Sequence, residues 1–506
     1  MTFNSQVIIQ DIRMDFEKML EYVTGEQART ATADATERGL FKMLIEMGLK
    51  LLTLFFIMRS QNASRKSCKA ADGSELGYHR DTKRRYVSIF GKLRFVRPYF
   101  YQKGKGGQIP LDAELSLGDD CYSDLVREVN DYLGVNGVYH KGCETLERLL
   151  GLRLSTRVVQ SNLGEDAADV LVYYAQKPAP VASSEAGILV IQADGKGVPM
   201  ILEETKTDGV RLGKGEKHGH KKEAIVTSVY SIEAFMRTPE QVVASYYDKI
   251  SLDRPSKPQN KHLWATLDGK DTALNRLAEQ VRFRLGSHIQ YKIALCDGCE
   301  ALQTRIAKHF PGFTQILDFI HANEYLWDVA NALFSETNDQ RFAWMRSHTL
   351  QLLSGQTSQL IAEFRSLATQ PKISKRKRIQ LLKTANYFER NLPFMDYPTY
   401  LSNGWPIASG VIEGACRHFV KDRCELSGMR WLQSGAENLL RLRAVAENND
   451  WDNYHAYRKQ QRHQRLYASL PTNLVPVEAQ AFIPAPAVEP LIPNKSSAYL
   501  QMPLAA

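Results

Sequence analysis

The sequence predicts a protein of the α/β class: a mixed β-sheet core, an all-α segment inserted into it, and a mostly helical region before it. Two observations predict the sheet. One apolar run, Ile188-Leu-Val-Ile-Gln-Ala, ends at Asp194-Gly195, and a second, Tyr291-Lys-Ile-Ala-Leu-Cys, ends at Asp297-Gly298. Such runs are typical of buried strands, and the glycine indicates a tight turn after each carboxylate. A third observation, a helical pattern without strands from 322 to about 390, predicts the insertion.

The composition narrows the class of protein. A chain of 506 residues has room for roughly two to four domains. Its net charge of +9, with a pI near 9.0, favours a polyanionic partner, although a basic protein without such a partner has the same balance. Seven cysteines are few and odd in number, so we expect a reducing cytoplasm and no disulfide framework. The apolar stretch 40–58 carries three charges on one helical face and is expected to be an amphipathic core helix, not a membrane span.

The first region, 1–110, is expected to be helical with one β-hairpin. Apolar residues recur at helical spacing up to about residue 60, whereas residues 80–103 alternate between apolar and polar. Gly91-Lys92 separates the two alternating stretches and predicts the hairpin turn. Pro98 then favours an edge position, because proline cannot donate a ladder hydrogen bond.

The next region, 111–180, is expected to hold several helices and a candidate helix-turn-helix. Ser155 is the predicted N-cap of the last helix of this motif. That helix would offer Arg157, Gln160 and Asn162 to DNA, and a plain helical bundle explains the same spacing equally well. A Pro/Ala/Ser linker follows at 178–186.

The rest of the chain divides into four parts. The first part of the sheet core, 187–321, is expected to hold strands at 187–193, 198–203, 223–231, 290–296 and 314–319, with a crossing helix at about 272–285. The all-α insertion covers 322–405, and the C-terminal helices of the core cover 406–465. Residues 471–506 contain seven prolines and are expected to form a disordered tail.

Three acids are expected to meet at one edge of this sheet. Asp194 and Asp297 follow strands, and Glu413 begins a helix after a loop rich in proline and glycine. Hard cations prefer oxygen ligands, so three carboxylates are suited to two Mg²⁺ ions. Two such ions can activate an attacking oxygen and stabilise the leaving oxygen of a phosphodiester. Taken singly, an Asp at the end of a strand is more often a turn residue.

Five segments carry a family resemblance: Ala193-Asp194-Gly-Lys-Gly-Val-Pro, Gly213-Lys-Gly-Glu-Lys-His-Gly-His-Lys-Lys-Glu-Ala, Leu295-Cys-Asp297-Gly, Val411-Ile-Glu413-Gly-Ala-Cys-Arg-His-Phe-Val-Lys-Asp-Arg and Ser427-Gly-Met-Arg-Trp431. With these segments, in this order, the chain resembles bacterial insertion-sequence transposases of the ISKra type, which are distant relatives of the Mutator-like transposases. The resemblance covers roughly residues 110 to 460.

The resemblance implies a ribonuclease H-like core in which Asp194, Asp297 and Glu413 form an Asp-Asp-Glu triad and bind two Mg²⁺ or Mn²⁺ ions. It also implies an all-α insertion before the glutamate, in agreement with the helical pattern. Relatives carry an acid or cysteine, two residues and a histidine after the second aspartate. Here that motif matches Asp318-Phe-Ile-His321, an accessory pair that would order the site or contact DNA, or else a strand-end acid beside a satisfied histidine.

The chain departs from its relatives in one respect. Many of them have a cysteine-containing segment in the N-terminal region, and no paired Cys-x-x-Cys occurs there in this sequence. The one such motif, Cys296-Asp-Gly-Cys299, encloses the presumed catalytic Asp297, where thiolates would compete with magnesium chemistry. We therefore expect no zinc.

Basic residues near the acids are the expected DNA contacts. Residues 206–222 hold six Lys/Arg and two acids among several glycines, a composition suited to following phosphates but also to a solvated loop. Trp431 would either stack on an unpaired base or anchor the core. The full expected set is Arg157, Gln160, Asn162, Lys214, Lys217, Lys221, Lys222, Arg417, His418, Lys421, Arg430 and Trp431.

The sequence thus indicates a DNA transposase that cleaves insertion-sequence ends and joins the 3′-hydroxyl to target DNA. Its expected partners are the element's terminal repeats, target DNA and at least one further copy of itself in the DNA complex; no membrane partner is expected. The expected location is the bacterial cytoplasm, at the nucleoid. Two alternatives stay open: a catalytically silent, transposase-derived DNA-binding protein, and a metal-dependent nuclease that cuts without joining.

Overall fold

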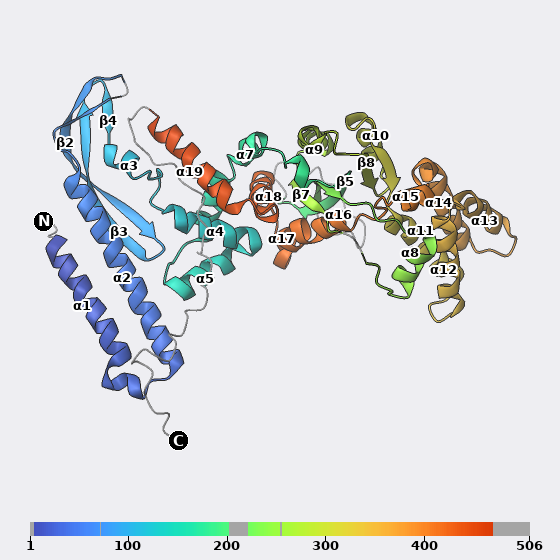
Figure 1. Cartoon of the computed structure of the whole chain (residues 1–506), viewed down its shortest axis with the longest axis horizontal. Coiled ribbons are helices and arrows are strands. Elements are labelled where there is room, and N and C mark those ends of the chain that lie inside the picture. The colour runs from blue at the N-terminus through green and yellow to red at the C-terminus, as the bar shows by residue number, and fades with distance from the viewer. Residues whose placement is uncertain (1–4, 71, 202–220, 254–255, 469–506) are drawn as a thin grey trace, which may run out of the picture. The chain divides into compact units, whose positions relative to one another are not determined.

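The computed structural model of the chain describes residues 5–70, 72–201, 221–253 and 256–468 (Figure 1). The chain forms two compact units. The first unit comprises residues 1–134, 139–162 and 450–506, and the second comprises residues 135–138 and 163–449. The predicted mixed α/β class is confirmed, and so is a mixed sheet, which has five strands. The basic segment 202–220 and the proline-rich tail from 469 lie outside the described residues.

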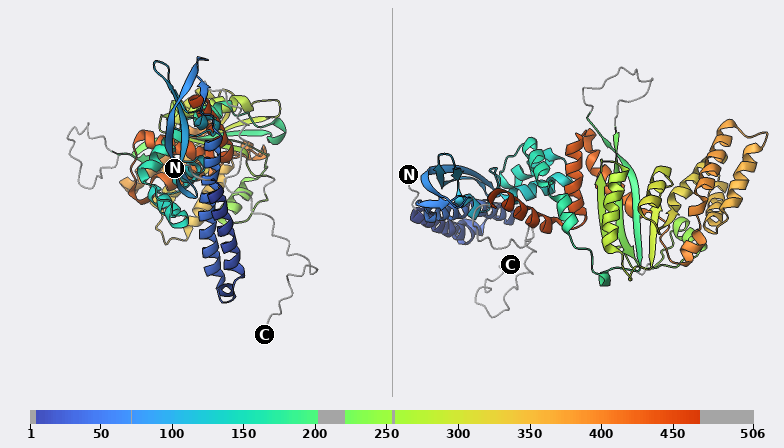
Figure 2. Two further views of the ribbon diagram at one scale, coloured as in Figure 1. Left: turned by 90° about the vertical axis from the view of Figure 1, so that its left-hand side faces the viewer. Right: turned by 90° about the horizontal axis from the view of Figure 1, so that it is seen from above.

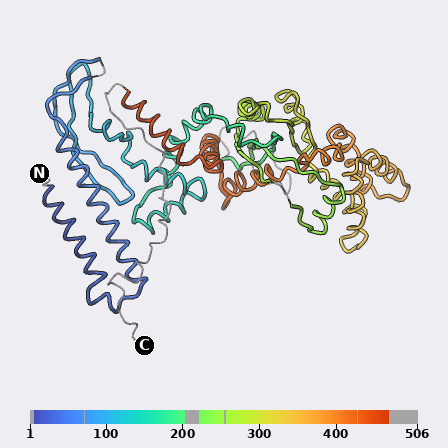
Figure 3. The backbone as a smooth tube through the Cα atoms, viewed as in Figure 1, coloured from blue at the N-terminus to red at the C-terminus, as the bar shows by residue number. Residues whose placement is uncertain are grey.

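The first unit begins with a hairpin of two long helices, α1 (Ser5–Thr24) and α2 (Ala33–Asn62), which run side by side in Figure 3. The short 3-10 helix η1 (Glu26–Arg29) joins them. α2 starts at Thr32, whose hydroxyl accepts a hydrogen bond from the Ala35 amide. Gly39 permits close packing, because a Cβ atom there would lie 2.2 Å from the hydroxyl of Tyr22.

A four-stranded antiparallel sheet follows, in the order β1-β2-β3-β4. Its strands are β1 (Ser67–Lys69), β2 (Glu75–Ser88), β3 (Gly91–Gln102) and β4 (Gly106–Gln108). The predicted hairpin is confirmed, but its turn is Ile89-Phe90 and not Gly91-Lys92, because Gly91 already pairs with Ser88. Pro98 has an open edge beside it, since β4 pairs only with 100–102. This edge position agrees with the prediction.

Helices complete the first unit and lead into the second. They are α3 (Pro110–Glu114), α4 (Asp124–Asn136), α5 (Tyr139–Leu150), α6 (Thr156–Asp166), α7 (Val170–Gln176) and, near the C-terminus, α19 (Trp451–Tyr467). The predicted succession of helices after residue 122 is therefore present, whereas a helix-turn-helix stays a prediction. Within the first unit, Asp124 of α4 pairs with Arg458 and Arg462 of α19. The short 3-10 helix η2 (Ala182–Ser184) lies in the predicted linker.

The second unit is built on the five-stranded sheet, in the order β7-β6-β5-β8-β9. The strands are β5 (Ile188–Pro199), β6 (Lys221–Ile232), β7 (Gln259–Thr266), β8 (Tyr291–Cys296) and β9 (Thr314–Leu317). β6 runs antiparallel to β5 and β7, whereas β5, β8 and β9 run parallel to one another. The carboxyl ends of the three parallel strands therefore share one edge of the sheet.

The observed strands differ from the predicted ones in the bounds of β5 and in the presence of β7. The chain does not turn after Asp194: β5 continues to Pro199 and pairs with β6 throughout, so 198–199 belong to β5. Gly195 serves close packing instead, because a Cβ atom there would lie 2.2 Å from a carboxylate oxygen of Glu223. β7 escaped prediction because its first residues are polar and only its last four are buried.

Alternate residues of β5 pack on the two faces of the sheet. Leu189, Ile191 and Ala193 contact α9 (Lys270–Arg284) and α10 (Glu300–His309). Ile188 and Val190 belong to a larger cluster on the other face. That cluster includes α8 (Pro239–Tyr247) and the helices α11 (Phe319–Leu333), α12 (Gln340–Leu353), α13 (Thr357–Thr369), α14 (Lys375–Asn391), η3 (Leu392–Phe394) and α15 (Tyr397–Ser402). Figure 2 shows this helical segment gathered at one side of the sheet.

The chain returns to the sheet through one helical segment, residues 410–424. It consists of α16 (Gly410–Ala415), the π-helical turn η4 (Cys416–Lys421) and α17 (Asp422–Cys424). The 3-10 turn η5 (Leu426–Gly428) and α18 (Gln433–Glu447) follow. Glu437 of α18 accepts hydrogen bonds from the Leu267 amide and the Thr266 hydroxyl, which fixes α18 at the end of β7. None of the helices in the described part of the chain has the length and apolarity that a membrane span requires.

The ion pair between Arg284 and Glu185 tests how the second unit is stabilised. Both side chains are buried, 3% and 1% exposed, and two N–O distances are 2.7 Å. We expect Glu185→Ala to lower the free energy of unfolding by about 3–5 kcal/mol, because Arg284 would stay buried without a counter-charge. Denaturant unfolding measures the change. The matched control, Glu144→Ala, removes the exposed pairs with His140 and Lys141 and should have no measurable effect. Equal effects of the two variants would contradict this account.

Candidate functional site

Three aspartates occupy matching positions at the carboxyl edge of the parallel strands. β5 pairs with β8, and the last pair lies two residues before Asp194 and two residues before Asp297. β8 pairs with β9, and the last pair lies one residue before Asp297 and one residue before Asp318. Neighbouring strands are about 4.8 Å apart. Continuing the register therefore sets Asp297 between Asp194 and Asp318.

The alternation of side chains along a strand places Asp194 on one face of the sheet. Successive side chains of a strand point to opposite faces. Asp194 lies within β5, four residues after Val190, which belongs to the cluster on the face covered by the all-α segment. Asp297 and Asp318 directly follow the last residues of β8 and β9, Cys296 and Leu317.

Glu413 reaches this edge from the 410–424 helical segment. Cys416, one helical turn after Glu413, donates its thiol hydrogen to Oδ2 of Asp194 at 3.2 Å. Ser409, one turn before it, donates its hydroxyl to Oε1 of Glu413 at 3.0 Å. Burial and the nearby Asp318 carboxylate raise the pKa of Glu413. The sequence offered a signal for the contact between Ser409 and Glu413, since residues four positions apart can share a helical face.

Asp318 is the fully buried acid of the site. Its Oδ1 accepts the Ile320 amide at 2.6 Å, which caps α11, and its Oδ2 accepts the Ser409 amide at 2.9 Å. One carboxylate therefore joins the end of β9, the start of α11 and the loop that precedes Glu413. Asp297 is held differently: its Oδ1 accepts the Cys299 amide at 2.9 Å, and its carbonyl accepts the Tyr387 hydroxyl at 2.8 Å.

Asp318, His321 and Glu413 form a group that fits a divalent cation. One ligand atom from each lies within 4.8 Å of the others. Nδ1 of His321 is 3.7 Å from Oδ2 of Asp318 and 4.0 Å from Oε1 of Glu413, too far for a hydrogen bond to either, and this buried nitrogen has no hydrogen-bond partner among the described residues. Asp318 raises the pKa of His321 to about 9, with smaller contributions from Glu324 and Asp297.

This donor set suits Mn²⁺ or Mg²⁺. Carboxylate oxygens are hard ligands, and one imidazole favours Mn²⁺ over Mg²⁺. A bound cation would relieve the repulsion between the Asp318 and Glu413 carboxylates and would compete with a proton for His321. Asp194 and Asp297 lie outside this group of three, although both act on it: Asp194 through Cys416, and Asp297 through its charge on His321.

The residues expected to contact DNA have varied surroundings. Arg417, Lys421 and Arg430 are exposed, and His418 pairs with Glu447 at 3.2 Å. Lys221 pairs with Glu425 at 2.5 Å, and Lys222 donates to Gln433 at 2.7 Å. On α6, Arg157 and Gln160 are exposed. Lys214 and Lys217 lie outside the described residues.

Two residues of that set are buried. Asn162 is 4% exposed, which corrects the expectation that it faces DNA with its neighbours on α6; its position falls on the inner side of that helix. Trp431 is 8% exposed, and its ring nitrogen donates to the Cys424 carbonyl at 2.9 Å. Its main chain also pairs with Pro199 and Ile201 at the end of β5. The ring is therefore a core anchor, the second of the two roles that its sequence context allowed.

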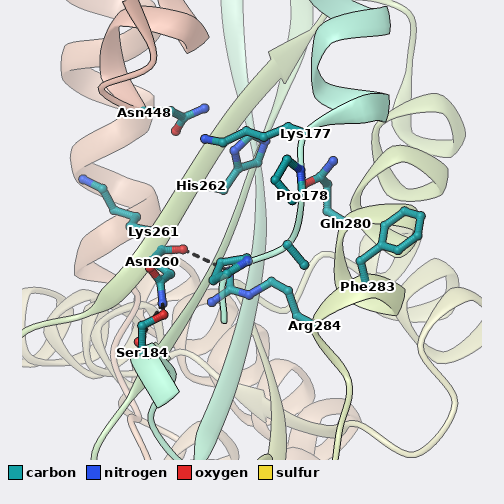
Figure 4. A pocket seen from close by; sticks show the side chains of 12 residues that line it. Lys177, Pro178, Ser184, Asn260, Lys261, His262, Gln280, Phe283, Arg284 and Asn448 are labelled. Carbon is teal, nitrogen blue, oxygen red and sulfur yellow. Dashed lines mark hydrogen bonds between the residues drawn. The ribbon is translucent and has the colours of Figure 1, made fainter. Parts of the chain in front are cut away.

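A separate basic pocket lies at the other end of the sheet, near the start of β5 (Figure 4). Its volume is about 310 Å³, and Lys177, Lys261, His262 and Arg284 are among its lining residues. Arg284 is neutralised by Glu185, and burial, with the nearby Arg276, lowers the pKa of His262 well below its usual value. The described lining contains no carboxylate, so this pocket lacks the ligands of a magnesium site.

No family model matches the chain, and no curated protein was found to be similar to it. The function has to be inferred from the site.

The raised pKa of His321 predicts a pH-dependent contribution to stability in metal-free buffer. A histidine whose pKa is raised by folding stabilises the fold fully below its unfolded pKa of about 6.5, and this stabilisation disappears as the pH rises through about 9. The difference in unfolding free energy between wild type and His321→Gln, measured with EDTA, should be largest near pH 6 and smallest above pH 9. A constant difference across that range would contradict the assigned ion pair with Asp318.

The cation site predicts specific losses of metal affinity. Glu413→Gln and His321→Ala should each weaken Mn²⁺ binding at least about tenfold in calorimetric titration, because each removes one ligand. Asp268→Asn is the matched control: Asp268 also follows a strand of this sheet and precedes a glycine, but it is exposed and outside the group. The site assignment fails if all three variants bind Mn²⁺ as wild type does.

Proposed function

We propose that the chain is a DNA transposase of the Asp-Asp-Glu type, with Asp194, Asp297 and Glu413 as its catalytic acids. The observation that carries the proposal is the shared edge: Asp194 and Asp297 hold matching positions on neighbouring parallel strands, and the helical segment of Glu413 is bonded to Asp194 through Cys416. The strands β7, β6 and β5 are antiparallel neighbours, and β8 and β9 continue the sheet parallel to β5. This order, with helices on both faces, also suits a ribonuclease H-like core.

The proposed reaction has two steps on one site. In the first, water attacks a phosphodiester at the element end; a P–O bond forms, another breaks, and a 3′-hydroxyl is released. In the second, that hydroxyl attacks a phosphodiester of target DNA, so that one P–O bond is again exchanged for another. Two bound Mg²⁺ or Mn²⁺ ions would supply activation of the attacking oxygen and stabilisation of the leaving oxygen.

The chain's own residues would hold the acids in place for both steps. Cys416 orients the carboxylate of Asp194, and the Cys299 amide orients that of Asp297. Asp318 fixes the loop before Glu413 through the Ser409 amide and places His321 beside Glu413. Such preorganisation matters because catalytic groups must be positioned before the barrier is reached. No covalent protein–DNA intermediate is required.

The charge distribution supports DNA as the substrate. The net charge is +9, and Arg417 and Lys421 are exposed on the same helical segment that carries Glu413. Cations at this place would meet the phosphates that flank a bound scissile bond. In the first unit, exposed Arg157 and Gln160 of α6 are the proposed contacts to the element ends.

Cleavage and strand transfer test the proposal directly. The substrate is DNA with the sequences that flank this chain's gene, incubated with Mg²⁺ or Mn²⁺. Asp194→Asn and Asp297→Asn should each lower cleavage at least about 100-fold while DNA binding stays within about twofold, because each removes a metal-binding charge. The control Asp268→Asn, at another strand end of this sheet, should cleave like wild type.

The same assay separates the alternatives. Cleavage without joining would identify a nuclease, and binding without cleavage by wild type would identify a catalytically silent DNA-binding protein. Retained cleavage by Asp297→Asn would remove that residue from the catalytic set and with it the proposed triad.

A further inference from the structure

Helix α2 exposes a row of large apolar side chains along one face. The row consists of Phe41, Leu44, Leu51, Phe55 and Met58, which are 47%, 53%, 49%, 45% and 40% exposed. The β-hairpin covers the neighbouring face of α2, where Phe56 stacks on Phe95 with ring centroids 4.4 Å apart, and its turn residue Phe90 borders the row at Gly48. Exposed apolar side chains are normal when single, whereas a contiguous row on one helix indicates an interface.

The spacing of the row is that of a coiled-coil seam. With Gly48 included, successive positions are separated by three, four, three, four and three residues. Gly48 leaves no gap, because the ring of Phe90 lies over it, 2.6 Å from where a Cβ atom would stand. This order of separations is the same in both directions along the helix. A row that reads alike in both directions is self-complementary when two copies meet antiparallel, and such a pair is related by a two-fold axis.

Helix α1 widens the apolar surface. Phe16, Leu20 and Val23 are 52%, 42% and 38% exposed and share one face of α1. Asp15 of α1 and Lys50 of α2 form an ion pair that joins the two helices. Phe16 and Leu51 are the next residues after them, so each lies about 100° around its helix from the ion pair. Antiparallel helices seen from one end turn in opposite senses, so both steps lead to the same side of the helix pair.

The exposed area is close to what a dimer needs. The eight side chains together expose on the order of 650 Å², if a large apolar side chain offers about 180 Å² when fully exposed. A standard interface buries about 800 Å² per partner, and neighbouring backbone and polar rim atoms add to the apolar figure.

We propose that this face binds a second copy of the chain, with the two α2 helices antiparallel about a two-fold axis between Gly48 and Leu51. Phe41 then lies opposite Met58 of the other copy, and Leu44 lies opposite Phe55. The dimer forms without DNA. It does not depend on the proposed activity, although a reaction that joins two element ends needs two copies of a site held together.

Self-association of the full chain in DNA-free buffer, measured by sedimentation velocity, is the test. Wild type should be dimeric at micromolar concentration, and Leu44→Glu and Phe55→Glu should each raise the dimer dissociation constant at least about tenfold. Leu149→Glu is the matched control, because Leu149 is 60% exposed at the end of α5 and outside the row. It should leave the dimer unchanged. A monomeric wild type, or equal loss in the control, overturns the proposal.

A charge pair tests the antiparallel register. Leu44→Lys and Phe55→Glu should each dissociate the dimer, whereas the double variant in one chain should recover most of the affinity, since every lysine then faces a glutamate. Dissociation of both single variants without recovery in the double variant overturns the register.

A chain ending at residue 468 tests whether the C-terminal segment, and not a second copy, occupies the row. If only the shortened chain dimerises, the C-terminal segment covers the row and the proposal is wrong. DNA cleavage by the same variants shows whether the proposed activity stands or falls separately.

Discussion

The candidate site depends on one buried carboxylate, that of Asp318. It accepts the Ile320 amide at the start of α11 and the Ser409 amide in the loop before Glu413, residues that are 89 positions apart in the chain. A carboxylate at 0% exposure is costly to desolvate unless its oxygens are hydrogen-bonded, and here both are. Because the all-α segment lies between these two contacts, its entry and exit are fixed at one point of the sheet. The helices can therefore be long without loosening the position of Glu413.

The acids of the site divide into two kinds. Asp318 uses its oxygens for the fold, which leaves fewer lone pairs for a ligand. Asp194 accepts hydrogen bonds from the Cys416 thiol and the Gly195 amide, whereas Glu413 accepts one from the Ser409 hydroxyl and keeps lone pairs that can bind a cation. Burial, followed by the charge of Asp318, raises the pKa of Glu413, whereas the interaction with Asp318 is the main cause of the raised pKa of His321. Asp318, His321 and Glu413 form a group that could hold a metal ion at this edge of the sheet.

The sequence predicted the strands that are buried along most of their length. The runs before Asp194 and Asp297 are apolar at almost every position, as strands covered on both faces must be, and both strands were predicted. β7 was missed because an edge strand needs only partial burial. The inward position of Asn162 and the burial of Trp431 are tertiary facts: each depends on which face of its segment meets the core. The contact of Cys416 with Asp194 spans 222 positions, so no local pattern contains it, and the matching of Asp194 with Asp297 follows from the strand register, which neither run specifies alone.

The π-helical turn after Glu413 sets the angular relation between the acid and the cations that follow it. A wider turn holds more residues per revolution than the α-helix around it, so it shifts the phase of everything downstream. In a uniform α-helix of the same sequence, Lys421 and the residues after it would be rotated relative to Glu413. A single-residue deletion in this turn would therefore keep every side chain of the site in the chain yet change which of them face the same direction.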